Sequence, residues 1–392
     1  MTVLVVTNDF PPHIGGIESF VAQACGFLDD DVAVLTSTAP GSAAWDADAT
    51  YPIERLPGPL LPTPAVGRAA ARLLHRSGAD RVLFGAAAPL ALLAPALRAA
   101  GAERIVALTH GHETWWATLP GSRSLLRRIG DQVDVLTTIS DYVSVRIVAA
   151  LSPEGRAKLV RLPPPVDLAM FAPGAVGARE RDHVRRVVSV GRMVKRKGFD
   201  TLLRAWSLLP SLLGAGSGQY DLRPDDLRPD DLGSYELVLV GDGPERERLT
   251  RLAARTGQQN IRFTGALNRS GVRAELQRSA VFAFPVRTRL GGLDPEGLGL
   301  APLEAAACGL PVVVGRSGGA PETVRHGRTG YVVDPDDPYE LAGRLAQLLA
   351  NPDHAHALGV AGRVFVGERY GSEQARHVLR SALELPKGMS DG

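Results

Sequence analysis

The chain has 392 residues, of which 45% are hydrophobic and 22% are charged. This composition is typical of a globular protein with two or three domains and excludes a wholly disordered chain. The formal net charge is only +2, which argues against a general nucleic-acid-binding protein, because such proteins carry a larger basic surplus. The two cysteines, Cys25 and Cys308, form no CxxC pair, so we expect neither a disulfide scaffold nor a structural zinc site.

The beginning of the chain reads as structure rather than as a targeting segment. An apolar run at Val3–Val6 starts at once, without a basic region before it, so no signal peptide is expected. The apolar stretch Val82–Leu97 contains Pro89 and Pro95 and is shorter than the roughly 20 residues that span a bilayer. It predicts a buried strand followed by a buried helix, and the chain as a whole predicts a cytoplasmic protein.

Short apolar runs alternate with helical stretches through the first half of the chain. The runs are continuous, which is typical of parallel strands buried on both faces. Helices are expected at Gly67–Arg76 and Pro89–Ala99. The expected strands are Val3–Val6, Val32–Leu35, Val82–Phe84, Ile105–Leu108 and Val133–Ile139.

The second half repeats this pattern and ends in a helical stretch at Asp353–Leu385. Strands that alternate with helices predict an α/β protein with two doubly wound domains. The expected strands here are Val187–Val190, Leu237–Val240, Ile261–Phe263, Val281–Phe284, Val312–Val314 and Tyr331–Val333.

Prolines and polar residues predict the boundary between the two domains. Pro163–Pro165 stops regular structure, and Ala172–Asp182 resembles a linker. We expect an N-terminal domain over residues 1–170, a C-terminal domain over 171–370, and a last helix in 371–392 that returns to the first domain. The repeated sequence DLRPD at Asp221–Asp230 is expected to be a solvated loop.

Charge is distributed unevenly in the first domain. Residues 1–57 contain one Arg and eight acidic residues, whereas residues 58–128 contain nine Arg and three acidic residues. These could be two solvated faces that cancel, or a basic face for an anionic partner. The basic residues that would form a membrane or acceptor face are Arg68, Arg72 and Arg76 on one helix face, and the cluster Arg123, Arg127 and Arg128.

Two loops of the first domain carry candidate site residues. Gly15 and Gly16 follow the first strand, where backbone N–H groups at a helix start can approach a phosphate. The loop lacks a full GxGxxG or Walker pattern, which disfavours dehydrogenases and P-loop proteins. His110 and His112 follow a buried strand, and with no third ligand nearby we interpret His110 as a polar contact rather than a metal ligand.

Two loops of the second domain carry stronger candidates. Gly191–Gly198 contains four cations within six residues, which suits a diphosphate or, equally, a solvated basic loop. Arg287–Glu304 contains two glutamates eight residues apart, Glu296 and Glu304, with glycines after the first. On a helix this spacing covers about 12 Å, enough to reach along a nucleotide sugar.

Together these motifs resemble the retaining glycosyltransferases of family 4, which have the GT-B fold, two Rossmann-like doubly wound domains facing across a cleft. The resemblance covers nearly the whole chain and rests on Gly15-Gly16, His110, Arg192 with Lys197, and Glu296 with Glu304. The segments NDFPPHIGGIES, THGHE and RTRLGGLDPEGLG are similar to those of actinobacterial GDP-mannose-dependent phosphatidylinositol mannosyltransferases, in particular those that add the α-1,6-linked mannose to phosphatidylinositol monomannoside.

The resemblance implies a role for each matching residue. Gly15 and Gly16 would approach the diphosphate, His110 would contact the transferred sugar, and Arg192 and Lys197 would neutralise the diphosphate. Glu296 and the backbone of Gly297, Leu298 and Gly299 would hold the hexose hydroxyls, and Glu304 the ribose hydroxyls. The catalytic set would be His110, Arg192, Lys197 and Glu296.

The resemblance also implies a metal-independent reaction without a cofactor. GDP-mannose would be the donor, an inositol phospholipid the acceptor, and an anionic membrane surface the partner of a peripherally attached, cytoplasmic enzyme; nucleic acid is not expected as a partner. A soluble family 4 enzyme with another nucleotide sugar and a non-lipid acceptor is an alternative. An inactive nucleotide-sugar-binding protein is a third interpretation, against which the intact Glu296, Glu304, Arg192 and Lys197 argue.

Overall fold

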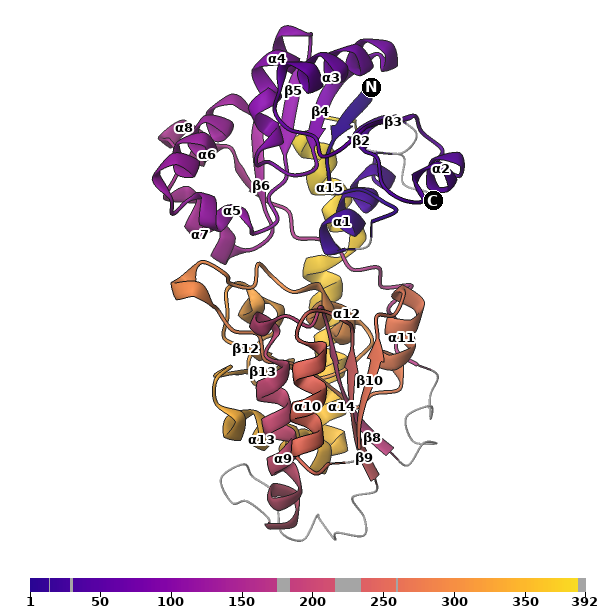
Figure 1. The fold of residues 1–392 in the computed structure, drawn as a ribbon, viewed down its shortest axis with the longest axis vertical. Coiled ribbons are helices and arrows are strands. Elements are labelled where there is room, and N and C mark those ends of the chain that lie inside the picture. Colours follow the sequence, from indigo (N-terminus) through magenta and orange to yellow (C-terminus); the bar gives the residue numbers. More distant parts are fainter. Residues whose placement is uncertain (14, 29–30, 175–183, 216–233, 259, 387–392) are drawn as a thin grey trace. The chain divides into compact units, whose positions relative to one another are not determined.

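The computed structural model describes residues 1–13, 15–28, 31–174, 184–215, 234–258 and 260–386. The chain divides into two compact units (Figure 1). Unit 1 contains Met1–Pro165 and the segment from Ser372 onward, and unit 2 contains Val166–Gly371. The DLRPD repeat and most of the expected linker lie outside the described residues.

Unit 1 is built on a seven-stranded sheet in the order β3-β2-β1-β4-β5-β6-β7, in which every neighbouring pair is parallel. Val3–Val6, Val34 and Leu83 are fully buried, as expected for strands covered on both faces. The strands are β1 Thr2–Val6, β2 Val32–Ser37, β3 Ile53–Leu56, β4 Ala79–Phe84, β5 Arg104–Ala107, β6 Val135–Thr138 and β7 Leu159–Arg161.

The helices of unit 1 begin and end at residues suited to those positions. In α3, Thr63 caps the N-terminus by accepting from the Val66 N–H, Pro64 follows it, and Gly78 ends the helix with a φ of 66°. The helices are α1 Gly16–Gly26, α2 Ser42–Ala47, α3 Pro64–Ser77, α4 Ala94–Ala99, α5 Glu113–Trp116, α6 Pro120–Gln132, α7 Asp141–Val148, α8 Pro153–Ala157 and α15 Ser372–Ala382, with a 3-10 turn η1 at Leu90–Leu93.

The last helix, α15, belongs to unit 1 although it lies at the end of the chain. Leu379 and Leu383 pack into the core of this unit with Val3 and Phe20. Two arginines of the sheet, Arg81 and Arg104, donate to the carbonyls of Leu383 and Ala382. Apolar burial and these hydrogen bonds together attach the C-terminal segment to unit 1.

Unit 2 contains a six-stranded parallel sheet in the order β10-β9-β8-β11-β12-β13. Helices α9, α10 and α13 lie against one face, and α12 packs with α14 on the other (Figure 1). The fully buried Trp206 of α9 lies in the core and donates its indole N–H to Asn260. The strands are β8 Val184–Val190, β9 Ser234–Val240, β10 Ile261–Gly265, β11 Val281–Phe284, β12 Val312–Gly315 and β13 Gly330–Val333.

The helices of unit 2 are connected to the strands in the alternating manner of a doubly wound fold. Two helical predictions need correction. Asp353–Leu385 is not one helix, because Gly371 adopts an extended conformation after Tyr370 and separates α14 from α15. Pro89–Ala99 likewise divides into η1 and α4. The helices are α9 Phe199–Ala215, α10 Arg246–Arg255, α11 Arg269–Gln277, α12 Leu300–Ala307, α13 Pro338–Ala350 and α14 Pro352–Tyr370, with 3-10 turns η2 Lys195–Lys197, η4 Leu290–Gly292 and η5 Ala320–Thr323.

The prediction of two doubly wound α/β domains is confirmed by these two parallel sheets. Each sheet changes its direction of winding once along the chain, next to its first strand. In unit 1 this occurs where β1 neighbours β4, and in unit 2 where β8 neighbours β11. Ligands of such sheets bind at the carboxyl ends of the strands at this switch point, so the loops after these strands are where a site is expected.

Candidate functional site

The switch point of unit 2 brings together two charged residues that are 99 positions apart in the sequence. Lys197 lies in the loop after β8, and Glu296 in the loop after β11. The Lys197 Nζ atom lies 2.7 Å from Glu296 Oε2 and 4.6 Å from the ring centre of Phe284. The side chains of this ion pair are 12% and 10% exposed, so the pair is nearly removed from solvent.

A glycine allows the two loops to approach this closely. Gly198 has a φ of 71°, and a Cβ atom at this position would collide with the Pro285 carbonyl oxygen. Only glycine combines the left-handed conformation with the space that is present. The loop after β8 therefore packs backbone against backbone on the loop after β11, which sets the position of Lys197.

The charge of Glu296 is stabilised by two cations. Burial raises the pKa of this carboxyl, but Lys197 and Arg196 outweigh burial and hold the pKa below its ordinary value. The Arg196 guanidinium lies 3.9 Å from Glu296 and 3.6 Å from Asp294. Glu296 is therefore an anionic hydrogen-bond acceptor at neutral pH.

The loop after β12 holds the backbone of Glu296. The Gly319 N–H donates to the Glu296 carbonyl at 2.9 Å, and Gly318, with a φ of 55°, leaves no room for a Cβ atom beside that carbonyl. The contact of this glycine pair is with the backbone of Glu296, so the pair supports a predicted site residue.

The predicted backbone contacts at Gly297, Leu298 and Gly299 precede α12. Gly299 is the N-cap of this helix, with a φ of 100°, and Leu298 is buried. Glu304 lies farther along α12, in its second turn. Because this glycine-containing loop leads directly into the start of α12, it lies in the positive potential of a helix N-terminus.

Glu304 has an unusual protonation equilibrium. Burial raises the pKa of this carboxyl to about 7, although the nearby Arg269 lowers it. Near neutral pH both protonation states of Glu304 are therefore populated. A site that uses Glu304 as an acceptor for ribose hydroxyls, as predicted, would then respond to pH.

We expect the affinity for a nucleotide to increase as the pH rises through about 7. Above this pH Glu304 becomes a carboxylate, which accepts stronger hydrogen bonds than the neutral acid. Glu304→Gln should make the affinity for GDP nearly independent of pH in this range. Calorimetric titration of GDP from pH 6 to pH 8 measures the affinity of the unmodified protein and of the variant. An equally steep profile in Glu304→Gln would contradict this role.

The pKa of Glu304 also has a consequence for stability. Because the folded-state pKa lies above the ordinary value of 4.5, the folded protein binds the proton more tightly than the unfolded chain. The contribution of this group to the free energy of unfolding therefore falls as the pH rises from about 4.5 to about 7. In Glu304→Gln this pH-dependent contribution should be absent.

Arg192, the other predicted diphosphate ligand, lies in the loop after β8 and is exposed. Its side chain makes no ion pair with any residue that the structure describes. The structure therefore brings Lys197 and Glu296 together directly and leaves Arg192 available for a ligand.

The candidates of unit 1 lie after the strands at its own switch point. Gly15 is the N-cap of α1 and Gly16 its first residue. His110 follows β5, and its Nε2 atom lies 2.5 Å from the Gly85 carbonyl oxygen in the loop after β4. Since a carbonyl can only accept, Nε2 must carry the proton and donate. Phe20 of α1 contacts the imidazole edge to face, with the ring centres 5.7 Å apart.

His110 is neutral in this environment. Burial lowers the pKa of its imidazole, and the nearby Glu113 only partly opposes this effect. With Nε2 donating to Gly85, the neutral ring has its acceptor at Nδ1. The interpretation of His110 as a polar contact in the site stays a prediction.

Glu113 contacts the candidate residue His110, although the sequence assigned Glu113 no role. Its side chain is fully buried, and Oε2 accepts from the backbone N–H groups of His110 and Gly111 at 3.0 and 3.1 Å. Oε1 lies 3.3 Å from His112 Nε2. The spacing of three residues between His110 and Glu113 resembles a capping interaction, and that was the signal available in the sequence.

Metal ligands do not gather at either switch point. Within the described ranges, no group of three or more His, Cys, Asp or Glu side chains is placed to hold a metal ion. His110 and His112 are instead engaged with Gly85 and Glu113.

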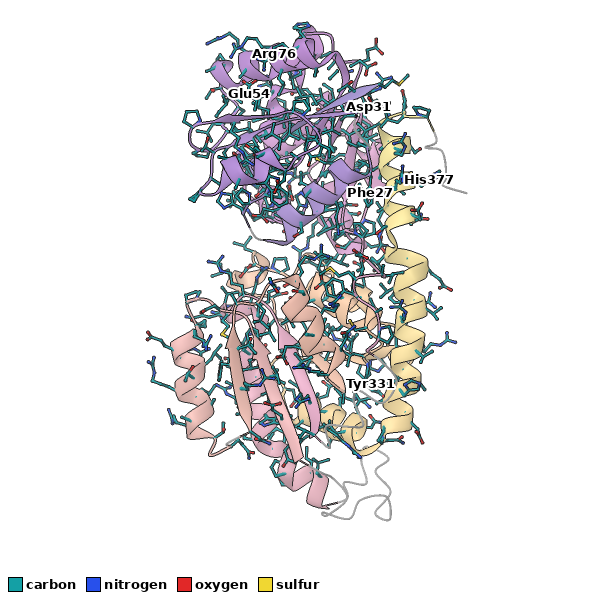
Figure 2. The ribbon with its side chains drawn as sticks, turned by 90° about the vertical axis from the view of Figure 1, so that its right-hand side faces the viewer. Phe27, Asp31, Glu54, Arg76, Tyr331 and His377 are labelled. Carbon is teal, nitrogen blue, oxygen red and sulfur yellow. The ribbon has the colours of Figure 1, made fainter. Side chains whose placement is uncertain are left out.

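The six arginines predicted to form a membrane or acceptor face are all exposed in unit 1. Arg76 of α3 forms an ion pair with Glu54 (Figure 2). Arg123 of α6 donates to the Ala149 carbonyl at 2.6 Å. Among the described helices none is both long and apolar enough to cross a bilayer.

Two Rossmann-like sheets also occur in the structures of Anabaena HepE in complex with UDP and glucose (TM-score 0.76, 15% identity, 98% of this chain and 100% of that one) and of sucrose-phosphate synthase from Thermosynechococcus elongatus (TM-score 0.75, 20% identity, 97% and 98%). The fold is that of the GT-B glycosyltransferases. Residues 14–170 match the family model Glycosyltransferase Family 4, and residues 178–365 match Glycosyl transferases group 1.

Curated relatives are similar over nearly the whole chain. A protein of Mycobacterium tuberculosis named GDP-mannose-dependent alpha-(1-6)-phosphatidylinositol monomannoside mannosyltransferase is 44% identical over 93% of both chains. One of Corynebacterium glutamicum, named GDP-mannose-dependent monoacylated alpha-(1-6)-phosphatidylinositol monomannoside mannosyltransferase, is 40% identical over 97% of both. The chain belongs to the family 4 glycosyltransferases, and the predicted resemblance is confirmed.

Proposed function

We propose that this enzyme transfers mannose from GDP-mannose to a phosphatidylinositol monomannoside, forming an α-1,6 linkage with retention of configuration. The observation that carries the proposal is the 44% identity over 93% of the chain to a relative named for this activity. The aligned region covers 93% of the chain and therefore includes most of both units. Phosphatidylinositol mannoside synthesis is accordingly the process in which the enzyme would act.

The geometry of unit 2 supports its assignment as the donor-binding unit. A leaving diphosphate accumulates negative charge in the transition state, and preorganised cations stabilise that charge. Lys197 is held in place by Glu296, and Arg192 in the same loop is free of acidic partners among the described residues. Glu296 and the loop up to Gly299 would bind the hexose, and Glu304 the ribose. These cations would supply the charge that a divalent metal supplies in other transferases.

In unit 1, the neutral His110 is suited to a hydrogen bond with the transferred sugar. Glu113 accepts from the backbone N–H of His110, and the Gly85 carbonyl accepts from its imidazole ring. Gly15 and Gly16 at the start of α1 would contribute backbone N–H groups to an anion. In a retaining transfer of this kind the leaving phosphate receives the acceptor proton, so no pair of carboxylates is needed at the anomeric carbon.

A donor and acceptor panel tests the proposal. The purified enzyme is incubated with GDP-mannose, UDP-glucose or UDP-galactose, and with phosphatidylinositol, its monomannoside or a water-soluble sugar acceptor. Mass spectrometry of the products should show one added hexose only with GDP-mannose and the monomannoside, and turnover should persist in excess chelator. Transfer to the soluble acceptor alone would support a soluble family 4 enzyme instead, and loss of turnover in chelator would overturn metal independence.

Unit 1 has features of a surface that would bind an anionic membrane peripherally, at the inner face of the plasma membrane. Arg68, Arg72 and Arg76 are exposed on α3, and Arg127 and Arg128 on α6. Near these arginines in the sequence, Trp115, Leu119 and Leu125 are 39%, 50% and 39% exposed. Basic residues at an anionic surface contribute about 1 kcal/mol each, and exposed apolar side chains add to the binding.

We expect Arg68→Glu/Arg72→Glu to reduce binding to phosphatidylinositol-containing vesicles by at least about tenfold at low salt, because two attractive charges become repulsive. Co-sedimentation measures this effect. Arg251→Glu on α10 is the matched control, since Arg251 is also an exposed helix residue, with a side chain that is 71% exposed. Equal binding of the parent to neutral and anionic vesicles would contradict the membrane proposal.

A further inference from the structure

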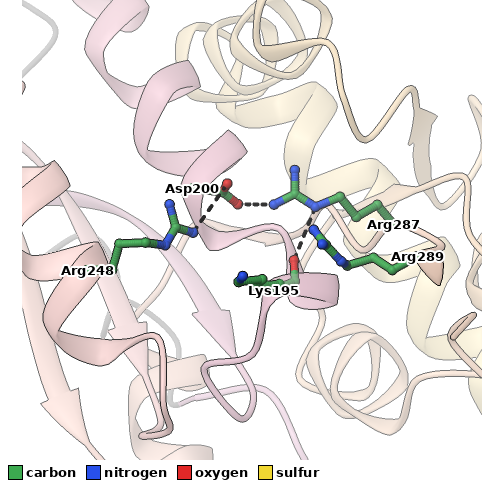
Figure 3. A pocket seen from close by; sticks show the side chains of 5 residues that line it. All are labelled: Lys195, Asp200, Arg248, Arg287 and Arg289. Atoms are coloured by element: carbon green, nitrogen blue, oxygen red, sulfur yellow. Dashed lines mark hydrogen bonds and ion pairs between the residues drawn. The ribbon is translucent and has the colours of Figure 1, made fainter.

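A cavity of about 250 Å³ in unit 2 is lined by four cationic side chains and one carboxylate (Figure 3). Its lining comes from η2, from the starts of α9 and α10, and from the loop after β11. The residues are Lys195, Asp200, Arg248, Arg287 and Arg289. None of them is among the residues predicted to bind the donor.

The cavity is separate from the donor residues because of the geometry of η2. A 3-10 helix has three residues per turn, so Lys195, Arg196 and Lys197 project in three different directions. Lys197 is directed to Glu296, whereas Lys195 lines the cavity. One short turn thus supplies cations to two places.

Asp200 organises one wall of the cavity. Its carboxylate lies between the guanidinium groups of Arg287 and Arg248 and forms ion pairs with both (Figure 3). Arg248 is also paired with Glu245 at 2.5 Å, and Arg287 with Asp336 at 3.3 Å. Three carboxylates thus face these two arginines, whose remaining N–H groups stay fixed in position.

Lys195 and Arg289 are different, because neither side chain has an acidic partner among the residues that the structure describes. Lys195 is exposed and Arg289 is partly exposed. Two uncompensated cations beside two immobilised arginines create a positive potential in a concave site. Such a combination of a lysine and arginine donors suits the several oxygens of a phosphate group.

The loop that carries Arg289 also presents apolar side chains to solvent. Leu290 is 72% exposed and Leu293 is 43% exposed. Leu290 adopts a φ of 52°, a conformation that is uncommon for a residue other than glycine. An amphiphile carries a phosphate group next to apolar chains. Exposed apolar side chains beside a cationic cavity are therefore expected where the ligand is an amphiphile.

We propose that this cavity is a second anion site, which binds a phosphate group independently of the donor residues. The phosphate is either that of a lipid headgroup or a soluble phosphate, and the recognition chemistry is the same for both. The site does not rest on the proposed mannosyl transfer, because its test compares binding and needs no turnover.

The test compares Lys195→Ala/Arg289→Ala with Arg251→Ala, which removes an exposed cation from α10 of the same unit. One arm measures co-sedimentation with vesicles of phosphatidylcholine that contain or lack phosphatidylinositol. The other arm titrates inorganic pyrophosphate calorimetrically, with and without excess GDP to occupy the donor residues. Thermal unfolding of each variant checks the fold, which should be retained because neither Lys195 nor Arg289 has an ion-pair partner in the described structure.

We expect the double variant to bind at least one of the two probes more weakly than Arg251→Ala, by about fivefold or more for each side chain removed. Weaker binding of phosphatidylinositol vesicles identifies a lipid headgroup, and Leu290→Ser should then weaken vesicle binding without changing pyrophosphate binding. Weaker binding of pyrophosphate alone identifies a soluble phosphate. If the double variant and Arg251→Ala bind both probes equally, the cavity is not an anion site and the proposal is overturned.

Discussion

Arg192→Ala is expected to lower turnover by about 10²–10³ while leaving the fold intact. The loss is that of one preorganised electrostatic donor to the leaving diphosphate. Arg192 is exposed and makes no ion pair within the described residues, so its removal leaves no buried charge uncompensated. Turnover measured at saturating donor, together with a thermal unfolding curve, separates catalysis from stability.

Lys197→Ala should lower turnover by a similar factor, but it should also destabilise the protein. Removal of the lysine leaves the nearly buried carboxylate of Glu296 with Arg196 at 3.9 Å as its nearest cation. Breaking a buried ion pair costs about 3–5 kcal/mol when no other partner remains, and Arg196 should reduce that cost. Lys197→Met/Glu296→Gln should recover stability but not turnover.

Arg251→Ala is again the control, since it removes an exposed arginine of the same unit. Its turnover and unfolding temperature should match those of the parent. Turnover of Arg192→Ala and Lys197→Ala within about threefold of the parent would show that neither cation stabilises the leaving group. The donor would then have to be bound by other residues.

The second large effect is expected at Glu113. Glu113→Ala removes the acceptor of two backbone N–H groups, those of His110 and Gly111, inside unit 1. Each orphaned buried donor costs about 1–3 kcal/mol, so the free energy of unfolding should fall by about 2–6 kcal/mol. Turnover should fall as well, because the turn that positions His110 is no longer held.

Glu113→Gln separates the hydrogen bonds from the charge. Its side-chain oxygen can still accept from both N–H groups, so most of the stability and turnover should return. Glu247→Ala serves as the control, since Glu247 is an acid with an 88% exposed side chain on α10. Chemical unfolding measures the stability, and steady-state kinetics the turnover, of the unmodified protein and of the variants Glu113→Ala, Glu113→Gln and Glu247→Ala. If Glu113→Ala unfolds at the same denaturant concentration as Glu247→Ala, the carboxylate does not hold the turn.

Most of the sheet structure was predictable because central parallel strands are buried on both faces. All eleven strands expected from continuous apolar runs are present, from Thr2–Val6 to Gly330–Val333. The two strands that were not expected, Ile53–Leu56 and Leu159–Arg161, lie at the edges of the unit 1 sheet. They are short and contain Glu54, Arg55 or Arg161, and their residues are only partly buried. An edge strand is buried less completely, so its sequence lacks the continuous apolar signal.

The fold class, the family and the loops that carry the candidate residues could be predicted from the sequence, because they follow from local hydrophobic pattern and from motif spacing. The contacts between these residues became visible only in the folded chain. Glu296 pairs with Lys197 across 99 positions of sequence, and Glu113 accepts from the backbone of His110. The cationic cavity joins residues as far apart as Lys195 and Arg289. Such contacts depend on strand order and on the close approach of loops, which local sequence patterns do not contain.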